Sequence, residues 1–170
     1  MARPRGGDFC YSGSEFDVLR RDVDHALEGG ADGVAFGILT GDGGIDVKRC
    51  RRVIRQIGRG GDVVFHRAFD RTAEPLEAIE QLVDLGVRRV MTSGSARTAL
   101  AGAALIRELA DRAAGRIEIL PAGGIRPGNA LRVARQTGCD QLHTSLRDRG
   151  GKMSVTALAE MVQVIRGVTR

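Results

Sequence analysis

The segment VVFHRAFDRTAEPLEAIEQLVDLG, residues 63–86, decides the fold class, because it reads as one strand followed by one helix. Its first five residues, 63–67, are mostly β-branched or aromatic, which is typical of a buried strand. Pro75 then begins a helical pattern that Gly86 ends. The apolar residues of this pattern share one helix face: Leu76, Ile79, Leu82 and Val83. The segment therefore predicts one βα unit.

The same unit recurs along the chain with a regular spacing. Short β-rich runs occupy residues 34–39, 63–67, 89–93, 117–120 and 141–144, and their starts lie 24 to 29 residues apart. Helical patterns begin near Ser12 (with Glu15 in a capping box), Asp46, Pro75, Gly102, Pro127 and Ser154. Alternating strands and helices predict a parallel sheet with helical crossovers. The regular spacing, and the lack of a GxGxxG motif after the first strand, favour an α/β fold of the TIM (β/α)8-barrel type over a doubly wound sheet.

The predicted barrel is incomplete. Residues 1–4 add a strand stub to the five strands, and 170 residues are fewer than the ~250 of a full barrel. We therefore expect one domain over residues 1–170, either an open α/β variant or a barrel shortened at its N-terminus. Missing strands would leave two sheet edges exposed, which favours a homo-oligomer or, as a further alternative, a poorly folding fragment that aggregates.

Composition argues against several classes of protein. The formal charge is +5, from 26 Lys and Arg against 21 Asp and Glu, but the cationic residues are scattered among acidic ones. With one Tyr and no Trp, we expect no nucleic-acid binding. The longest apolar run, residues 33–39, is far too short to cross a membrane, and we see no secretory signal. Three cysteines without a CxxC motif predict reduced thiols, a cytoplasmic location and no structural zinc.

In parallel barrels the ligand site lies at the carboxyl ends of the strands, and polar residues gather there in this sequence. The residues that we expect at this end are Arg3, Arg5, Asp8, Cys10, His66, Arg67, Asp70, Thr92, Ser93, Gly123, Gly124, His143, Thr144 and Ser145. The arginines would hold an anion. Gly123 and Gly124, just before a helix, would let the backbone approach a phosphate, and Ser145 would add a hydroxyl donor.

Three of these residues are candidates for acid–base catalysis, namely His66, Asp70 and His143. Each has a structural alternative. The imidazoles could be core groups that hold loops, and Asp70 could cap the following helix. The double glycine could serve only a turn with positive φ. Cys10, at the same end, is a candidate soft metal ligand or nucleophile.

The stretch RPRGGDFCYS at residues 3–12, together with FHRAFD at residues 65–70, resembles the CutC copper homeostasis family. Shorter matching motifs follow the same order: GADGV at 30–34, FGILT at 36–40, GID at 44–46, TSG at 92–94, IEI at 117–119, GGI at 123–125 and LH at 142–143. This resemblance covers nearly the whole chain and implies a TIM-barrel-like fold, a cytoplasmic location and copper handling. Family members normally carry about two further βα units before the RPRGGDF segment. We therefore expect the first two units to be missing here, through a misassigned start codon or a truncated gene.

Two functions follow as hypotheses. The first is a copper homeostasis protein that binds copper(I) through Cys10 with one or both of His66 and His143, since thiolate and imidazole suit this soft ion. The second is an enzyme that acts on a small phosphorylated or carboxylated metabolite, held by the arginines and glycines. Both require one arrangement of five residues at a common rim of the sheet: Cys10, His66, Arg67, Gly123 and His143.

Overall fold

We analysed the protein as a computed structural model, which describes residues 1–147 and 150–166. Its sheet consists of four parallel strands: β1 (Gly33–Phe36), β2 (Asp62–Phe65), β3 (Arg89–Thr92) and β4 (Glu118–Pro121). The spatial order β1-β2-β3-β4 equals the order along the chain. Each crossover therefore leads to the adjacent strand, as in the wall of a (β/α) barrel, and this agrees with the predicted architecture.

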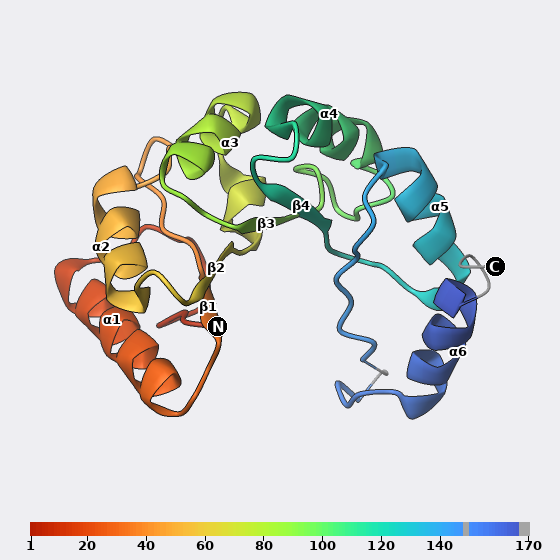
Figure 1. Ribbon diagram of the computed structural model, residues 1–170, viewed down its shortest axis with the longest axis horizontal. Coiled ribbons are helices and arrows are strands. Elements are labelled where there is room, and N and C mark those ends of the chain that lie inside the picture. The colour runs from red at the N-terminus through yellow and green to blue at the C-terminus, as the bar shows by residue number, and fades with distance from the viewer. Residues whose placement is uncertain (148–149, 167–170) are drawn as a thin grey trace.

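The helices of the described residues lie along the outer side of the sheet, and together they form an open arc from α1 to α6 (Figure 1). They are α1 (Gly13–Glu28), α2 (Val47–Ile57), α3 (Pro75–Asp84), α4 (Ala103–Ala113), α5 (Pro127–Thr137) and α6 (Val155–Arg166). The predicted capping box is present, because Ser12 Oγ accepts the N–H of Glu15 and the Glu15 carboxylate accepts the N–H of Ser12. Asp46 caps α2 without a capping box, because its Oδ1 accepts the N–H of Arg49. Local signals thus fix where the helices begin.

The core lies between the sheet and the helices. In every strand the second and fourth residues are buried, while the first and third are partly exposed. Because neighbouring residues of a strand point to opposite faces, the partly exposed set, which includes Met91, faces the inner side of the arc. The largest fully buried side chains include Phe36, Phe65 and Phe69. Each such burial contributes ~1.5–3 kcal/mol, so this core holds the strand ends, and the loops that follow them, in fixed positions.

The two edge segments differ from the prediction. Residues 1–4 and 141–144 are not strands in the described part of the chain. Ala2 donates its N–H to the carbonyl of Ala35 at 2.9 Å. At the other edge, His143 donates its N–H to the carbonyl of Pro121 at 2.9 Å, within a single parallel bridge. An edge segment has a neighbour on one side only, so few hydrogen bonds enforce an extended backbone there. Both segments still run beside the sheet.

Two predicted strands also end earlier than expected. The run at 34–39 is a strand only to Phe36, and the run at 63–67 only to Phe65. His66 is instead the N-cap of a short 3₁₀ helix, η1 (Arg67–Arg71). After β2 the His66 side chain accepts the N–H of Ala68, and after β1 the backbone of Leu39 pairs with Phe9 and Ile45 instead of with β2. The residues just beyond the strands therefore form the site described below.

Helix α6 carries exposed apolar side chains, among them Val155 and Leu158. The expectation of self-association stays a prediction.

In residues 1–147 and 150–166, no helix has both the length and the apolar character to cross a membrane.

Candidate functional site

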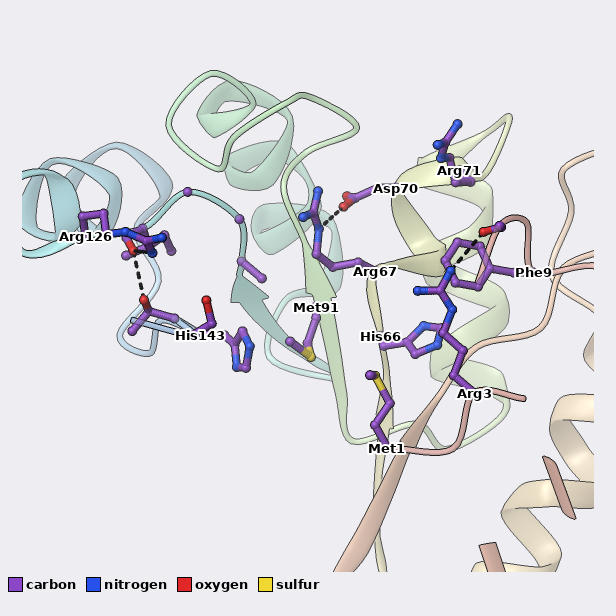
Figure 2. A pocket seen from close by; sticks show the side chains of 17 residues that line it. Met1, Arg3, Phe9, His66, Arg67, Asp70, Arg71, Met91, Arg126 and His143 are labelled. Carbon is purple, nitrogen blue, oxygen red and sulfur yellow. Dashed lines mark hydrogen bonds and ion pairs between the residues drawn. The ribbon is translucent and has the colours of Figure 1, made fainter. Parts of the chain in front are cut away.

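A pocket of about 560 Å³ lies at the carboxyl ends of the strands (Figure 2). Four segments that are far apart in the sequence line it, together with Met91 of β3: the N-terminal loop, the segment after β2, the loop after β4, and residues 143–145. Its lining residues are Met1, Arg3, Gly7, Phe9, His66, Arg67, Asp70, Arg71, Met91, Ala122, Gly123, Gly124, Ile125, Arg126, His143, Thr144 and Ser145. The structure thus brings most of the expected polar residues to one rim, including both imidazoles.

The charge of the pocket is strongly positive. Arg3, Arg67, Arg71 and Arg126 line it, and Asp70 is the carboxylate among the described lining residues. Asp70 forms an ion pair with Arg67, in which the Nε–Oδ2 distance is 2.7 Å. The guanidinium groups of Arg3, Arg71 and Arg126 therefore have no carboxylate partner among the described lining residues. A cleft of one charge sign attracts ligands of the opposite charge.

Asp70 holds this rim together. Its Oδ1 accepts the Thr92 hydroxyl at 2.6 Å and the N–H of Ser93 at 2.8 Å. Its Oδ2 accepts Arg67 Nε at 2.7 Å. Both oxygens are occupied, so Asp70 is placed to position its neighbours rather than to abstract a proton. It does not cap the following helix either, because Glu74 is the N-cap of α3.

Thr92 and Ser93, which we expected to touch a ligand, lie beneath the pocket instead. Both are fully buried and do not line it. Thr92 donates to Asp70, and Ser93 Oγ accepts Arg67 Nη2 at 2.8 Å. Their contribution to the site is therefore indirect, through the orientation of Arg67 and Asp70.

His66 is buried in the pocket wall with 4% of its surface exposed. Its Nδ1 accepts the N–H of Ala68 at 3.2 Å, which caps η1. Burial lowers the pKa of His66 to about 4, so the ring is neutral at pH 7. Close packing needs Gly37, where a Cβ would lie 2.6 Å from the imidazole. The ring centroid of Phe9 lies 5.2 Å from that of His66.

Arg3 lies beside His66 and Phe9 on the same side of the pocket, whereas Arg126 and His143 lie on the other side (Figure 2). The Arg3 guanidinium stacks over the Phe9 ring, with its Cζ 4.7 Å from the ring centroid. Its Nη2 donates to the carbonyl of Gly7 at 3.0 Å. Desolvation of its ring lowers the pKa of His143, which also favours a neutral ring.

The loop after β4 forms the opposite wall. Gly123 and Gly124 have φ of +107° and +68°, a region that favours glycine. Space is also tight, because a Cβ on Gly124 would lie 2.8 Å from Thr98 Cγ2. The Thr144 hydroxyl donates to the carbonyl of Ile125 at 2.9 Å, and this hydrogen bond holds residues 143–145 against the loop. The exposed Ser145 lines the pocket.

Cys10 and Arg5 lie outside the pocket lining. Cys10 Sγ donates to the carbonyl of Thr40 at 3.2 Å, and burial raises the pKa of its thiol. Arg5 donates to Glu15 at 2.6 Å and to Asp8 at 2.8 Å, so it folds the N-terminal loop onto α1. Within the described residues, no group of three His, Cys, Asp or Glu side chains could hold a metal ion. The structure therefore does not gather Cys10 with the two imidazoles.

Sequence reasoning missed several lining residues. Arg71 and Arg126 line the pocket although we did not select them. Both had a usable signal, since Arg71 extends the FHRAFD motif and Arg126 follows the double-glycine turn directly. Phe9 and Met91 carried no polar signal and could not be found in this way.

The fold and the site define a class: a (β/α)-barrel type of protein with a positively charged pocket at the carboxyl ends of its strands. The family follows from comparison with known proteins. The model of the CutC family matches residues 1–148, and the chain belongs to this family. The structure of CutC from Streptococcus agalactiae superposes with a TM-score of 0.79 at 33% identity, over 84% of this chain and 69% of that chain. This confirms the predicted α/β fold of partial TIM-barrel type.

Curated relatives agree with this assignment. A family protein CutC from Treponema denticola is 45% identical over 157 residues, which cover 92% of this chain and 63% of the relative. A mouse protein named copper homeostasis protein cutC homolog is 44% identical over 162 residues, which cover 94% of this chain and 59% of the relative. The chain thus spans about three fifths of the length of these relatives. Thiamine phosphate pyrophosphorylase from Pyrococcus furiosus, with a TM-score of 0.60 at 19% identity over 92% of this chain and 77% of that chain, shares the fold alone.

Proposed function

We propose that this chain binds a small phosphorylated or carboxylated metabolite in the pocket and serves copper homeostasis in the cytoplasm. The cellular role rests on the names of the mouse and human relatives, each 44% identical to this chain. The class of ligand is inferred from the positive charge of the pocket. Four arginines line the pocket. Among the described lining residues the carboxylate is that of Asp70, and it already forms an ion pair with Arg67.

The volume and the donors of the pocket support this ligand class. Small-molecule sites typically measure ~300–1,000 Å³, and this pocket has about 560 Å³. Gly123 and Gly124 bring backbone to the surface beside Arg126 and the start of α5, where helix N-terminal N–H groups favour anions. If the ligand is also a substrate, His143 is the candidate for proton transfer, because its ring lines the pocket and is neutral at pH 7.

The ligand proposal is tested with inorganic phosphate. Tm is measured by thermal unfolding of the whole chain as phosphate is added, with sodium chloride at matched ionic strength. A ligand at ~100 times its Kd stabilises the folded state by ~2.7 kcal/mol, which raises Tm by about 5–10 °C at this size. Arg126→Gln should reduce the shift by more than half. Arg132→Gln on the same helix, outside the pocket, should leave it unchanged.

Equal shifts in phosphate and chloride, or equal losses in the two variants, would overturn the ligand proposal. Either result would mean that phosphate acts as a general salt and not at this pocket.

A second candidate is direct binding of copper(I) through Cys10, His66 and His143, which the names of the mammalian relatives favour. The three residues do not fit the ion as a set in the described conformation, since Cys10 lies outside the pocket lining. This candidate predicts stoichiometric copper(I) binding in competition with a chromophoric chelator under reducing conditions. Cys10→Ala should abolish the binding, and stoichiometric binding that survives this change would remove Cys10 from the assignment.

A further inference from the structure

Arg67 is fixed before any ligand arrives. Its Nε donates to Asp70 at 2.7 Å and its Nη2 to Ser93 Oγ at 2.8 Å. Its Nη1 makes no hydrogen bond to the described residues, and this atom packs against Gly123, where a Cβ would lie 3.1 Å from it. A free guanidinium donor is therefore held over the double-glycine turn. A donor held in this way loses little conformational freedom when a ligand binds.

The turn itself adds two backbone donors. The N–H groups of Gly123 and Gly124 make no hydrogen bond to another group in residues 1–147 and 150–166. The Arg126 side chain lines the same wall, at the start of α5. Several guanidinium and backbone donors around one turn suit the three oxygens of a tetrahedral phosphoryl group better than the two coplanar oxygens of a carboxylate.

The opposite wall offers donors of another kind. His66 Nδ1 accepts the N–H of Ala68, so the proton of the neutral ring sits on Nε2. His66 Nε2 is buried and has no hydrogen-bond partner among the described residues. Buried donors without an acceptor are rare in folded proteins and mark a place where an acceptor belongs. An Nε2 that carries a proton has no lone pair for a metal ion, so this tautomer is a hydrogen-bond donor.

We infer that the ligand is a phosphorylated compound that also carries a hydroxyl or carbonyl oxygen. The phosphoryl group binds to Arg67 Nη1 and the Gly123–Gly124 turn, and the second oxygen accepts the N–H of His66 Nε2 across the pocket. This inference rests on the proposed function and deepens it, because it fixes the class of the ligand and its direction in the pocket.

The test compares two probes and two variants by isothermal titration calorimetry on the whole chain. Inorganic phosphate reaches the glycine wall only, whereas glycerol 3-phosphate adds hydroxyl oxygens. His66→Asn keeps an acceptor for the Ala68 N–H and loses the donor at the position of Nε2. His66→Gln keeps a donor near that position. We expect His66→Asn to weaken glycerol 3-phosphate about fivefold to tenfold and inorganic phosphate less than twofold, and His66→Gln to recover most of the loss.

Arg67→Lys provides the matching perturbation of the other wall. It keeps the charge but loses the fixed, forked geometry, so both probes should weaken by a similar factor, about tenfold. Circular dichroism and Tm without ligand identify variants that do not fold.

The outcomes separate this inference from the proposed function. If inorganic phosphate does not bind to the unmodified chain, the proposed function fails. If phosphate binds but His66→Asn weakens both probes equally, or neither, the ligand does not use His66 Nε2 and the inference fails while the anion site stands.

Discussion

Replacing Asp70 by Asn is the sharpest perturbation of the site, because the change is isosteric and removes one charge. The Asn carbonyl can still accept from Thr92 and from the N–H of Ser93, as Asp70 Oδ1 does at 2.6 and 2.8 Å. Its amide nitrogen would face Arg67 Nε, which now donates to Asp70 Oδ2 at 2.7 Å. Two donors then oppose each other, and the charge-assisted hydrogen bond is lost.

The magnitude follows from the burial of the two groups. A hydrogen bond to a charged group contributes ~1.5–3 kcal/mol. The Asp70 side chain is 9% exposed but that of Arg67 is 43% exposed, so solvent screening lowers the expected loss to about 1–2 kcal/mol. For a chain of this size, that loss lowers Tm by about 2–8 °C. Because Arg67 is also released from its position, phosphate affinity should fall in the same variant.

The assay is a double-mutant cycle with Asp70→Asn and Arg67→Met, measured by urea unfolding. The two residues contact each other directly, so their effects should couple by about 1 kcal/mol. Additive losses, or a Tm for Asp70→Asn within 1 °C (about the measurement error) of the unmodified chain, would refute the reasoning that Asp70 holds Arg67 in place.

Two further predictions concern the walls of the pocket. The pKa of His66 falls from 6.5 in the unfolded chain to about 4 in the folded one. The unfolded chain therefore binds more protons than the folded chain between these two pH values. As a result, the free energy of unfolding drops as pH falls from 6.5 to 4, by up to about 3 kcal/mol. Urea unfolding across this range should show a flatter pH dependence for His66→Asn, and an unchanged slope would contradict the buried, neutral ring. Gly124→Ala should destabilise the fold by about 1–2 kcal/mol, because φ is +68° and the new Cβ would lie 2.8 Å from Thr98. Gly128→Ala in α5 is the control, because a Cβ there meets nothing within 4 Å, and it should stabilise the fold by about 0.5–1 kcal/mol. Equal effects in the two glycine variants, measured by thermal unfolding, would remove the strain argument.

The parts of the fold that the sequence predicts are those set by local interactions. The Ser12 capping box, Asp46 and Pro75 determine where helices begin, and the spacing of strand and helix signals determines the parallel order of the strands. The edge segments at residues 1–4 and 141–144 could not be assigned correctly, because strand pairing there depends on neighbours that a local pattern does not contain.

The candidate site is predictable in its composition more than in its contacts. His66, Arg67 and Gly123 reach one rim because each follows the carboxyl end of a strand, and His143 joins them through its parallel bridge to Ala122. The direction of each side chain depends on tertiary contacts that no local motif states. Cys10 belongs to the N-terminal loop that lines the pocket, but its thiol donates to the carbonyl of Thr40 and lies outside the pocket lining.

Asp70 shows the same limit. Nothing in the motif FHRAFD indicates that its carboxylate would be saturated by Thr92, Ser93 and Arg67. Burial likewise decides the neutral state and the tautomer of His66, and burial is a property of the folded chain.

The central claim is that four distant segments form one cationic pocket that binds phosphate. The most direct measurement is an NMR titration of the ¹⁵N-labelled chain with inorganic phosphate at constant ionic strength. The account predicts saturable amide shifts concentrated at Arg67, Gly123, Gly124 and Ser145, with α2 unaffected. Shifts spread over the arginine-rich surface of α2, or no saturable shift at the double-glycine turn, would contradict it.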